Sequence, residues 1–216
     1  MANMSNIAAL REIASGFQKH EDRGKLSTGI PAMDRLTAGG IARGMLTEIY
    51  GPVSSGRTSF LFSLLGQATR QGECCAWIDV AGTFDPQSAA EAGACLDRIL
   101  WVNCEGNAEH ALKAVDLLTQ CGGFGVVVLD MADTPERDVR RISLASWFRL
   151  RHAAERTGAA LLVAGTKINA RSCSAVQIEM KSKRPVWVGK LLRGIRTEAE
   201  SRKHYRSQSA EFLAVI

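Results

Sequence analysis

The chain has few of the residues that build metal centres or disulfide frameworks. Its 216 residues include six cysteines and four histidines, and no two cysteines have the Cys-x-x-Cys spacing of a zinc ligand pair. We therefore expect the cysteines to be mostly buried small apolar side chains rather than disulfides. No metal is expected other than Mg²⁺ carried by a nucleotide.

Long hydrophobic runs are also missing. The longest apolar stretches, such as 125–129 and 159–164, are far too short to cross a bilayer, and the first residues lack the charged-then-apolar layout of a signal peptide. These absences predict a cytoplasmic protein without membrane contact.

Charge is present but unevenly distributed. Up to Glu136 there are 10 Lys and Arg against 16 Asp and Glu, a net charge of −6, whereas the remainder has 17 against 6, a net charge of +11. A basic second half favours contact with nucleic acid, with an acidic partner, or with both. The alternative is a chance clustering of solvated cations.

Apolar runs that end in turns and alternate with helical patterns predict an α/β fold. We expect a mostly parallel central sheet with helices on both faces and antiparallel edge strands at the C-terminal end, because uninterrupted apolar strands are typical of parallel sheets covered on both sides. The expected strands are 46–50, 74–80, 99–102, 124–130, 159–165, 175–180, 185–191 and 211–215, and the expected helices are 57–69, 86–93, 108–120 and 137–156.

The chain is expected to consist of two segments. Residues 1–25 are expected to form an amphipathic helix and a charged linker, and residues 26–216 a core domain with a basic C-terminal part. The apolar face of the helix consists of Ile7, Leu10, Ile13 and Phe17, which recur at helical spacing. This face could pack on its own core or contact a partner protein.

A phosphate-binding loop is the strongest motif. The pattern G-x-x-x-x-G-K-[ST] works because backbone N–H groups surround phosphate, a lysine reaches the β- and γ-phosphates, and the next hydroxyl holds Mg²⁺. Here the loop lies between an expected strand and an expected helix, but arginine occupies the lysine position. The planar guanidinium of arginine is larger than the ammonium of lysine, so arginine is a poor replacement for lysine in a narrow phosphate-binding loop. The candidate nucleotide residues are Gly51, Ser54, Ser55, Gly56, Arg57 and Thr58, together with Asp130 at the end of another buried strand.

Several short segments of the chain resemble segments of the bacterial recombinase RecA. They are Leu26-Ser27-Thr28-Gly29 with Met33-Asp34, then Gly39-Gly40-Ile41, then Glu48-Ile49-Tyr50-Gly51-Pro52 with Ser54-Ser55-Gly56, and Ala76-Trp77-Ile78-Asp79 with Asp85-Pro86. The resemblance covers about residues 26–165 and implies a RecA-like core that binds ATP and Mg²⁺.

The same resemblance shows where this chain departs from the family. The glutamate that positions the attacking water corresponds to Ala81, the tyrosine that stacks on adenine to Ser88, and the glutamine that senses the γ-phosphate to Thr166. Together with Arg57, these changes argue against a working ATPase and predict a pseudo-ATPase that binds ATP and Mg²⁺ weakly or not at all.

The loop that lies against single-stranded DNA in RecA corresponds to residues 167–174. It carries Lys167, Asn169 and Arg171, which are compatible with phosphate contacts, and it has no aromatic residue for base stacking. An ordinary solvated loop is the alternative.

A short RecA-like chain with a degraded site also resembles the ImuA family, the RecA-related accessory of bacterial mutagenic translesion synthesis. This resemblance implies a non-catalytic adaptor that works with an ImuB-like polymerase-family protein after DNA damage, and that contacts RecA, single-stranded DNA or another copy of itself. Two other functions stay open: a DNA-stimulated ATPase in which Glu48, Asp79, Asp85 or Asp130 supplies the missing carboxylate, and a sequence-independent single-stranded DNA-binding module.

Overall fold

A computed structural model describes residues 24–203 and 206–215. The predicted N-terminal helix with Ile7, Leu10, Ile13 and Phe17 lies outside these residues. Eight strands form one sheet in the order β10-β9-β8-β3-β7-β6-β4-β5, and β1 pairs with β2 in a separate two-stranded sheet. The strands are β1 (Lys25–Leu26), β2 (Ile41–Ala42), β3 (Leu46–Tyr50), β4 (Cys74–Asp79), β5 (Ile99–Asn103), β6 (Phe124–Asp130), β7 (Ala160–Gly165), β8 (Val176–Val188), β9 (Leu191–Lys203) and β10 (Arg206–Val215).

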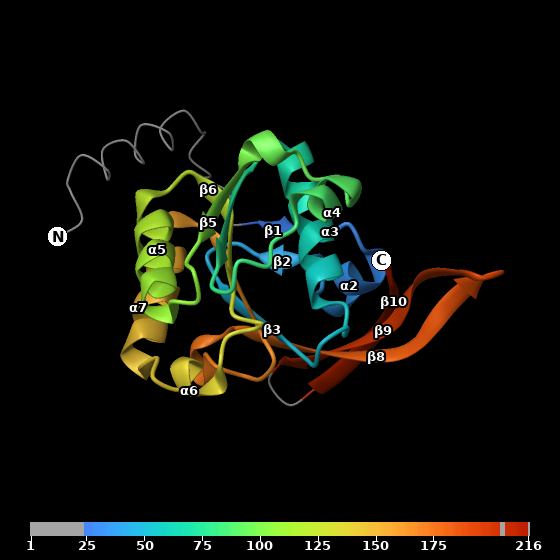
Figure 1. Cartoon of the computed structure of the whole chain (residues 1–216). Helices are drawn as coiled ribbons and strands as arrows, with labels where there is room; N and C mark the ends of the chain where they lie inside the picture. Colours follow the sequence, from blue (N-terminus) through green and yellow to red (C-terminus); the bar gives the residue numbers. More distant parts are fainter. Residues whose placement is uncertain (1–23, 204–205, 216) are drawn as a thin grey trace.

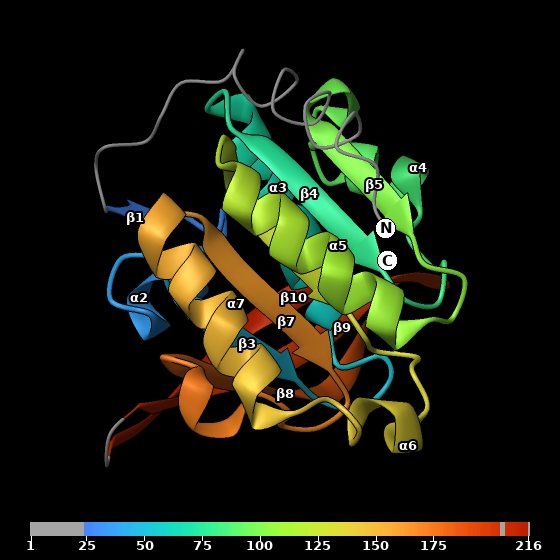
Figure 2. The same ribbon diagram turned by 90° about the vertical axis from the view of Figure 1, so that its left-hand side faces the viewer.

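Helices cover both faces of the parallel part of the sheet. The helices are α2 (Pro31–Leu36), α3 (Arg57–Arg70), α4 (Pro86–Glu91), α5 (Ala108–Cys121), α6 (Glu136–Val139) and α7 (Leu144–Thr157), with short 3₁₀ turns at Leu96–Arg98 and Arg171–Cys173. Helix α3 packs on one face, and Figure 2 shows α5 and α7 side by side on the other. Every residue of β3, β4, β6 and β7 is buried, as the uninterrupted apolar runs predict.

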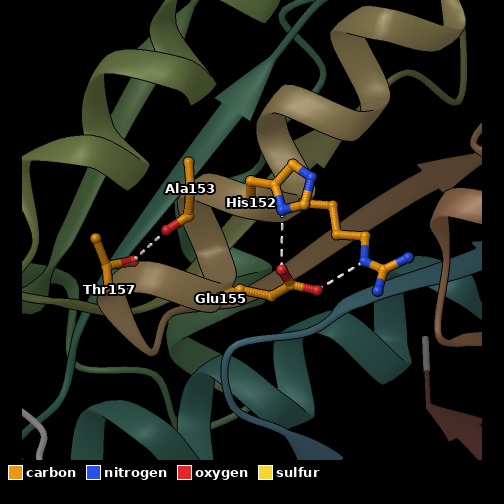
Figure 3. A network of polar contacts seen from close by, with 5 residues as sticks. His152, Ala153, Glu155 and Thr157 are labelled. Atoms are coloured by element: carbon orange, nitrogen blue, oxygen red, sulfur yellow. Dashed lines mark hydrogen bonds and ion pairs between the residues drawn. The ribbon is translucent and has the colours of Figure 1, made fainter.

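The predicted single helix 137–156 is wrong, because the chain forms α6 and α7 with a break at residues 140–143. Ser143 begins the second helix, and its hydroxyl accepts a hydrogen bond from the Ser146 N–H at 3.2 Å. Such a cap offers the backbone an alternative to a continuous helix. Near the other end of α7, Glu155 accepts from Arg151 at 2.7 Å and contacts His152 at 3.0 Å (Figure 3).

The C-terminal region is antiparallel, as predicted, but its strands are longer than the sequence pattern indicated. The segment expected to be one strand, 185–191, instead contains a hairpin turn at Gly189 and Lys190, and Gly189 has a φ of 62° that suits glycine. Strands β8 and β9 therefore form a long hairpin that extends away from the helices (Figure 1).

The N-terminal part of the described chain contains three short elements that the pattern did not predict: strands β1 and β2, and helix α2. Helix α2 begins at Pro31 and buries Met33 and Leu36, and Asp34 accepts hydrogen bonds from the backbone and hydroxyl of Thr28, both at 2.7 Å. Within the described residues, no helix is long and apolar enough to span a membrane.

Candidate functional site

The phosphate-binding loop lies at the carboxyl end of β3, where it turns into α3. Ser54 has a φ of 61° and Gly56 a φ of 88°, and Gly56 begins a helix of 14 residues that no side chain caps. Unpaired N–H groups at such a helix start attract anions. Thr58 is exposed at the same end, whereas Ser55 is buried and its hydroxyl has no partner among the described residues. The backbone of the predicted loop is therefore formed.

The two loop glycines are required by the C-terminal strands. A Cβ added at Gly51 would lie 2.2 Å from the carbonyl oxygen of Met180 in β8, and one at Gly56 would lie 2.7 Å from the hydroxyl of Thr197 in β9. Ser59, in the first turn of α3, donates a hydrogen bond to the Val215 carbonyl at 3.1 Å. The C-terminal strands thus lie directly against the loop and the start of its helix.

Arg57 points across the sheet to the next strand. Its Nη1 donates a hydrogen bond to the Gly165 carbonyl at the end of β7, at 2.6 Å, and the residue is only 8% exposed. Burial lowers the pKa of this guanidinium, and the nearby charges of Asp130 and Asp133 oppose that shift. The cation that occupies the lysine position is therefore bound to the protein itself.

Asp130 lies at the end of β6, close to Arg57 and Asp79. Burial raises its pKa to about 6, the charge of Asp79 adds to that rise, and a hydrogen bond from the Ala132 N–H at 3.0 Å together with the charge of Arg57 opposes it. The structure thus brings the predicted acid to the same edge of the sheet as the loop.

The site fits a phosphate group better than it fits Mg-ATP. The loop backbone and Thr58 suit a phosphate group. The surrounding side chains do not suit Mg-ATP, because Arg57 is bonded to Gly165 and because β9 and β10 lie against Gly56. We derive no catalytic step through a nucleotide at this site.

The other three carboxylates considered as substitute bases also have structural contacts. Asp79 accepts hydrogen bonds from the Gly82 N–H at 2.8 Å and the Phe84 N–H at 2.7 Å, and Asp85 caps the start of α4. Glu48 is fully buried in β3, where burial raises its pKa, and it accepts hydrogen bonds from the Asn169 and Ala170 N–H groups.

The positions that differ from the family lie around the same sheet edge. Ala81 is exposed in the turn that Asp79 holds, and Thr166 is exposed directly after β7. Ser88 is exposed in α4, where its hydroxyl and N–H both contact Asp85. None of the three supplies a carboxylate, an aromatic face or a long amide at its position.

The predicted DNA loop follows β7, which lies directly next to β6 in the sheet. Lys167 and Arg171 are exposed, and Lys167 pairs with Glu136 at 3.1 Å. The Asn169 side chain instead donates to the Lys167 carbonyl at 3.0 Å, so its amide contributes to the loop itself.

Sequence reasoning did not include the segment after β6 in this site. Between that segment and the loop lies a groove of about 600 Å³, whose lining includes Glu136, Arg140, Lys167 and Arg171. Arg140 also pairs with Glu136, at 2.6 Å. The position of this segment in the sequence could have indicated its role. Charged residues that follow a parallel strand lie at the edge of the sheet where ligands of α/β proteins bind.

The sequence is similar to known proteins over much of its length. Residues 11–169 match the family of the RecA N-terminal domain. The chain is 39% identical to Protein RecA of Ectopseudomonas oleovorans over 116 residues, which are 53% of this chain and 33% of the relative. It is 39% identical to Protein RecA of Deinococcus radiodurans over 127 residues, 57% of this chain and 35% of the relative.

A longer match joins it to Protein RecA of Haemophilus ducreyi, with 35% identity over 162 residues, 72% of this chain and 43% of the relative. The chain thus spans less than half the length of these relatives. Because the family match covers most of the sequence and the strand order places its motifs at one sheet edge, this chain belongs to the RecA family.

Proposed function

We propose that the chain is a non-catalytic RecA-like adaptor in bacterial DNA-damage tolerance, similar to the ImuA accessory of translesion synthesis. The observation that carries the proposal is the hydrogen bond between Arg57 and the Gly165 carbonyl. It joins the phosphate-binding loop to the strand that leads into the predicted DNA loop.

The contacts around Asp130 support the proposed loss of hydrolysis. Ala81 cannot orient water, and the carboxylates of Asp79, Asp85 and Glu48 hold local structure. Asp130 is the remaining acid, but it is 8% exposed and lies beside the guanidinium of Arg57. A general base must reach the water that it activates, so we assign the site no catalytic role.

The DNA loop is held at two points by side chains from β3 and α3. Arg57 bonds to Gly165 at its start, and Glu48 bonds to the N–H groups of Asn169 and Ala170. In this proposal the loop keeps one conformation, so any contact of Lys167 and Arg171 with single-stranded DNA does not depend on ATP.

The partner part of the proposal names an ImuB-like polymerase-family protein, with RecA or a second copy of this chain as further candidates. The RecA family match supports contact with RecA or with a second copy, whereas the ImuB-like partner is proposed from the resemblance to ImuA. The apolar residues Ile7, Leu10, Ile13 and Phe17 are the candidate contact. A full chain carrying Leu10→Asp is expected to lose affinity for the partner, whereas unchanged affinity would remove this segment from the proposal.

The decisive experiment is a calorimetric titration of the full chain with Mg-ATP, followed by a phosphate-release assay with single-stranded DNA. We expect no turnover in the wild-type chain or in Arg57→Lys, because Ala81 is still present. Turnover in the wild-type chain that disappears in Asp130→Asn would contradict the adaptor proposal and restore the ATPase function.

The alternative of a plain single-stranded DNA-binding module is favoured by the groove that contains Arg140, Lys167 and Arg171. If that were the whole function, binding should be tight without a protein partner and should fall steeply with salt. We expect weak binding whose salt slope decreases in magnitude by about 0.7 in Lys167→Gln. Tight binding by the isolated chain would favour the module over the adaptor.

A further inference from the structure

One carboxylate joins the two segments that border the groove beside β6 and β7. Glu136, in α6, accepts hydrogen bonds through the same oxygen, Oε1, from Arg140 at 2.6 Å and from Lys167 at 3.1 Å. Arg140 follows Glu136 by four residues in the same segment, whereas Lys167 belongs to the loop after β7, 31 residues further along the chain. The side chain of Glu136 therefore bridges two walls of the groove.

The groove is otherwise basic. Its charged lining residues, within the described part of the chain, are one carboxylate and three cations: Glu136, Arg140, Lys167 and Arg171. A carboxylate and a phosphate offer the same chemistry to Arg and Lys, because both present charged oxygens that accept charge-assisted hydrogen bonds. Glu136 therefore holds two of the three cations that a phosphate in this groove would need.

These ion pairs are exposed to solvent, so they can be exchanged for other partners. The side chains of Glu136, Arg140 and Lys167 are 51%, 75% and 67% exposed, and exposed ion pairs contribute little to stability. The hydrogen bonds from Arg140 and Lys167 lower the pKa of Glu136, so its carboxylate is ionised at neutral pH. The bridge is thus formed at neutral pH, but it is weak.

Other contacts position the backbone on both sides of the bridge. Glu48 accepts hydrogen bonds from two N–H groups of the loop after β7. On the opposite wall, Val139 and Ile142 pack against the buried apolar residues beneath α7. Opening the bridge would therefore free two cations without displacing the walls of the groove.

From these contacts we propose that Glu136 is an autoinhibitory latch: its carboxylate competes with phosphate groups for Arg140 and Lys167, and single-stranded DNA must displace it to bind in the groove. The inference rests on the proposed contact of DNA with the loop after β7, and it adds a residue that opposes that contact. The latch gives a physical reason for the weak DNA binding expected of the isolated chain.

The test is fluorescence anisotropy of the full chain with a labelled oligothymidine. Glu136→Gln is expected to bind about three to ten times more tightly than the wild-type chain, because two exposed ion pairs no longer compete with the phosphates. Glu109→Gln is the matched control, since Glu109 forms an exposed ion pair with Lys113 at 2.8 Å on α5 and lies outside the groove. This control loses the same charge and is expected to change the affinity by less than about twofold.

A double-mutant cycle with Lys167→Gln separates the latch from a general effect of net charge. The gain from Glu136→Gln should become smaller in a chain that already carries Lys167→Gln, because one of the two contested cations is gone; an equal gain in both backgrounds would overturn the latch. Equal affinity of the wild-type chain and Glu136→Gln would also overturn it, while leaving the DNA contact intact. If neither protein binds the oligothymidine, the DNA contact of the proposed function is wrong, and the latch is refuted with it.

Discussion

Replacing Asp130 by asparagine should stabilise the protein, and the amount should depend on pH. Burial raises the pKa of this carboxyl from its ordinary value of 3.8 to about 6. The folded protein therefore binds the proton more tightly than the unfolded chain, and the ionised carboxylate costs stability above that pKa. A rise of about two pKa units corresponds to about 3 kcal/mol.

The stability of the wild-type chain should consequently fall as the pH rises from about 4 to about 6, and Asp130→Asn should remove this part of the dependence. Near pH 8 the variant should be about 3 kcal/mol more stable than the wild-type chain, and near pH 4 the two should be nearly equal. Asparagine keeps an oxygen that can accept from the Ala132 N–H.

Urea unfolding at pH 4, 6 and 8, followed by circular dichroism, measures the difference directly. The comparison is made between the two proteins at each pH because Glu48 is also buried with a raised pKa, and its contribution is common to both. A variant that is less stable at pH 8, or a difference that is the same at all three values, would refute the reasoning.

Three further predictions follow from the same sheet edge. Arg57→Met should lower stability by about 1–3 kcal/mol, because it removes the hydrogen bond to the Gly165 carbonyl. It should also raise the pKa of Asp130 further, because a nearby positive charge is lost. Urea unfolding measures the first effect and an NMR titration the second, and an unchanged pKa would contradict the placement of Arg57. Glu48→Ala should make the amides of Asn169 and Ala170 exchange at least about tenfold faster, since they lose their acceptor, whereas retained protection would mean that Glu48 does not hold the loop. Gly51→Ala should cost at least about 2 kcal/mol in thermal unfolding, because the new Cβ would meet the Met180 backbone; a neutral substitution would place β8 elsewhere.

Much of the fold was predictable from local patterns. Strand β6 begins and ends at the residues that its apolar run indicated, and α3 begins at Arg57 as the loop motif required. These elements are buried on both faces or start at a strong turn, so periodicity and turn chemistry agree. The 137–156 segment was mispredicted because its helical periodicity continues through Ser143, whose capping contact decides the break.

The site was predictable only in part. Gly51 to Thr58 and Asp130 were recognised from their residue types and their places after strands, and the structure brings them to one edge. The hydrogen bond from Arg57 to the Gly165 carbonyl spans 108 residues, and the one from the Ala170 N–H to the Glu48 carboxylate spans 122. No local pattern contains such partners. The role of Asp79, which holds a turn, was also invisible before its two N–H donors were placed.

The sequence by itself determined the family, the parallel core and the residues of the phosphate-binding loop, because each of these is a property of residue identity at a short spacing. Only the tertiary structure decided which distant groups meet: Arg57 donates to a strand-end carbonyl, Glu48 accepts from the loop after β7, and β8 and β9 form a long hairpin. These outcomes depend on which distant segments the strand order places side by side. Strand order follows from packing of the whole sheet rather than from any single stretch of chain.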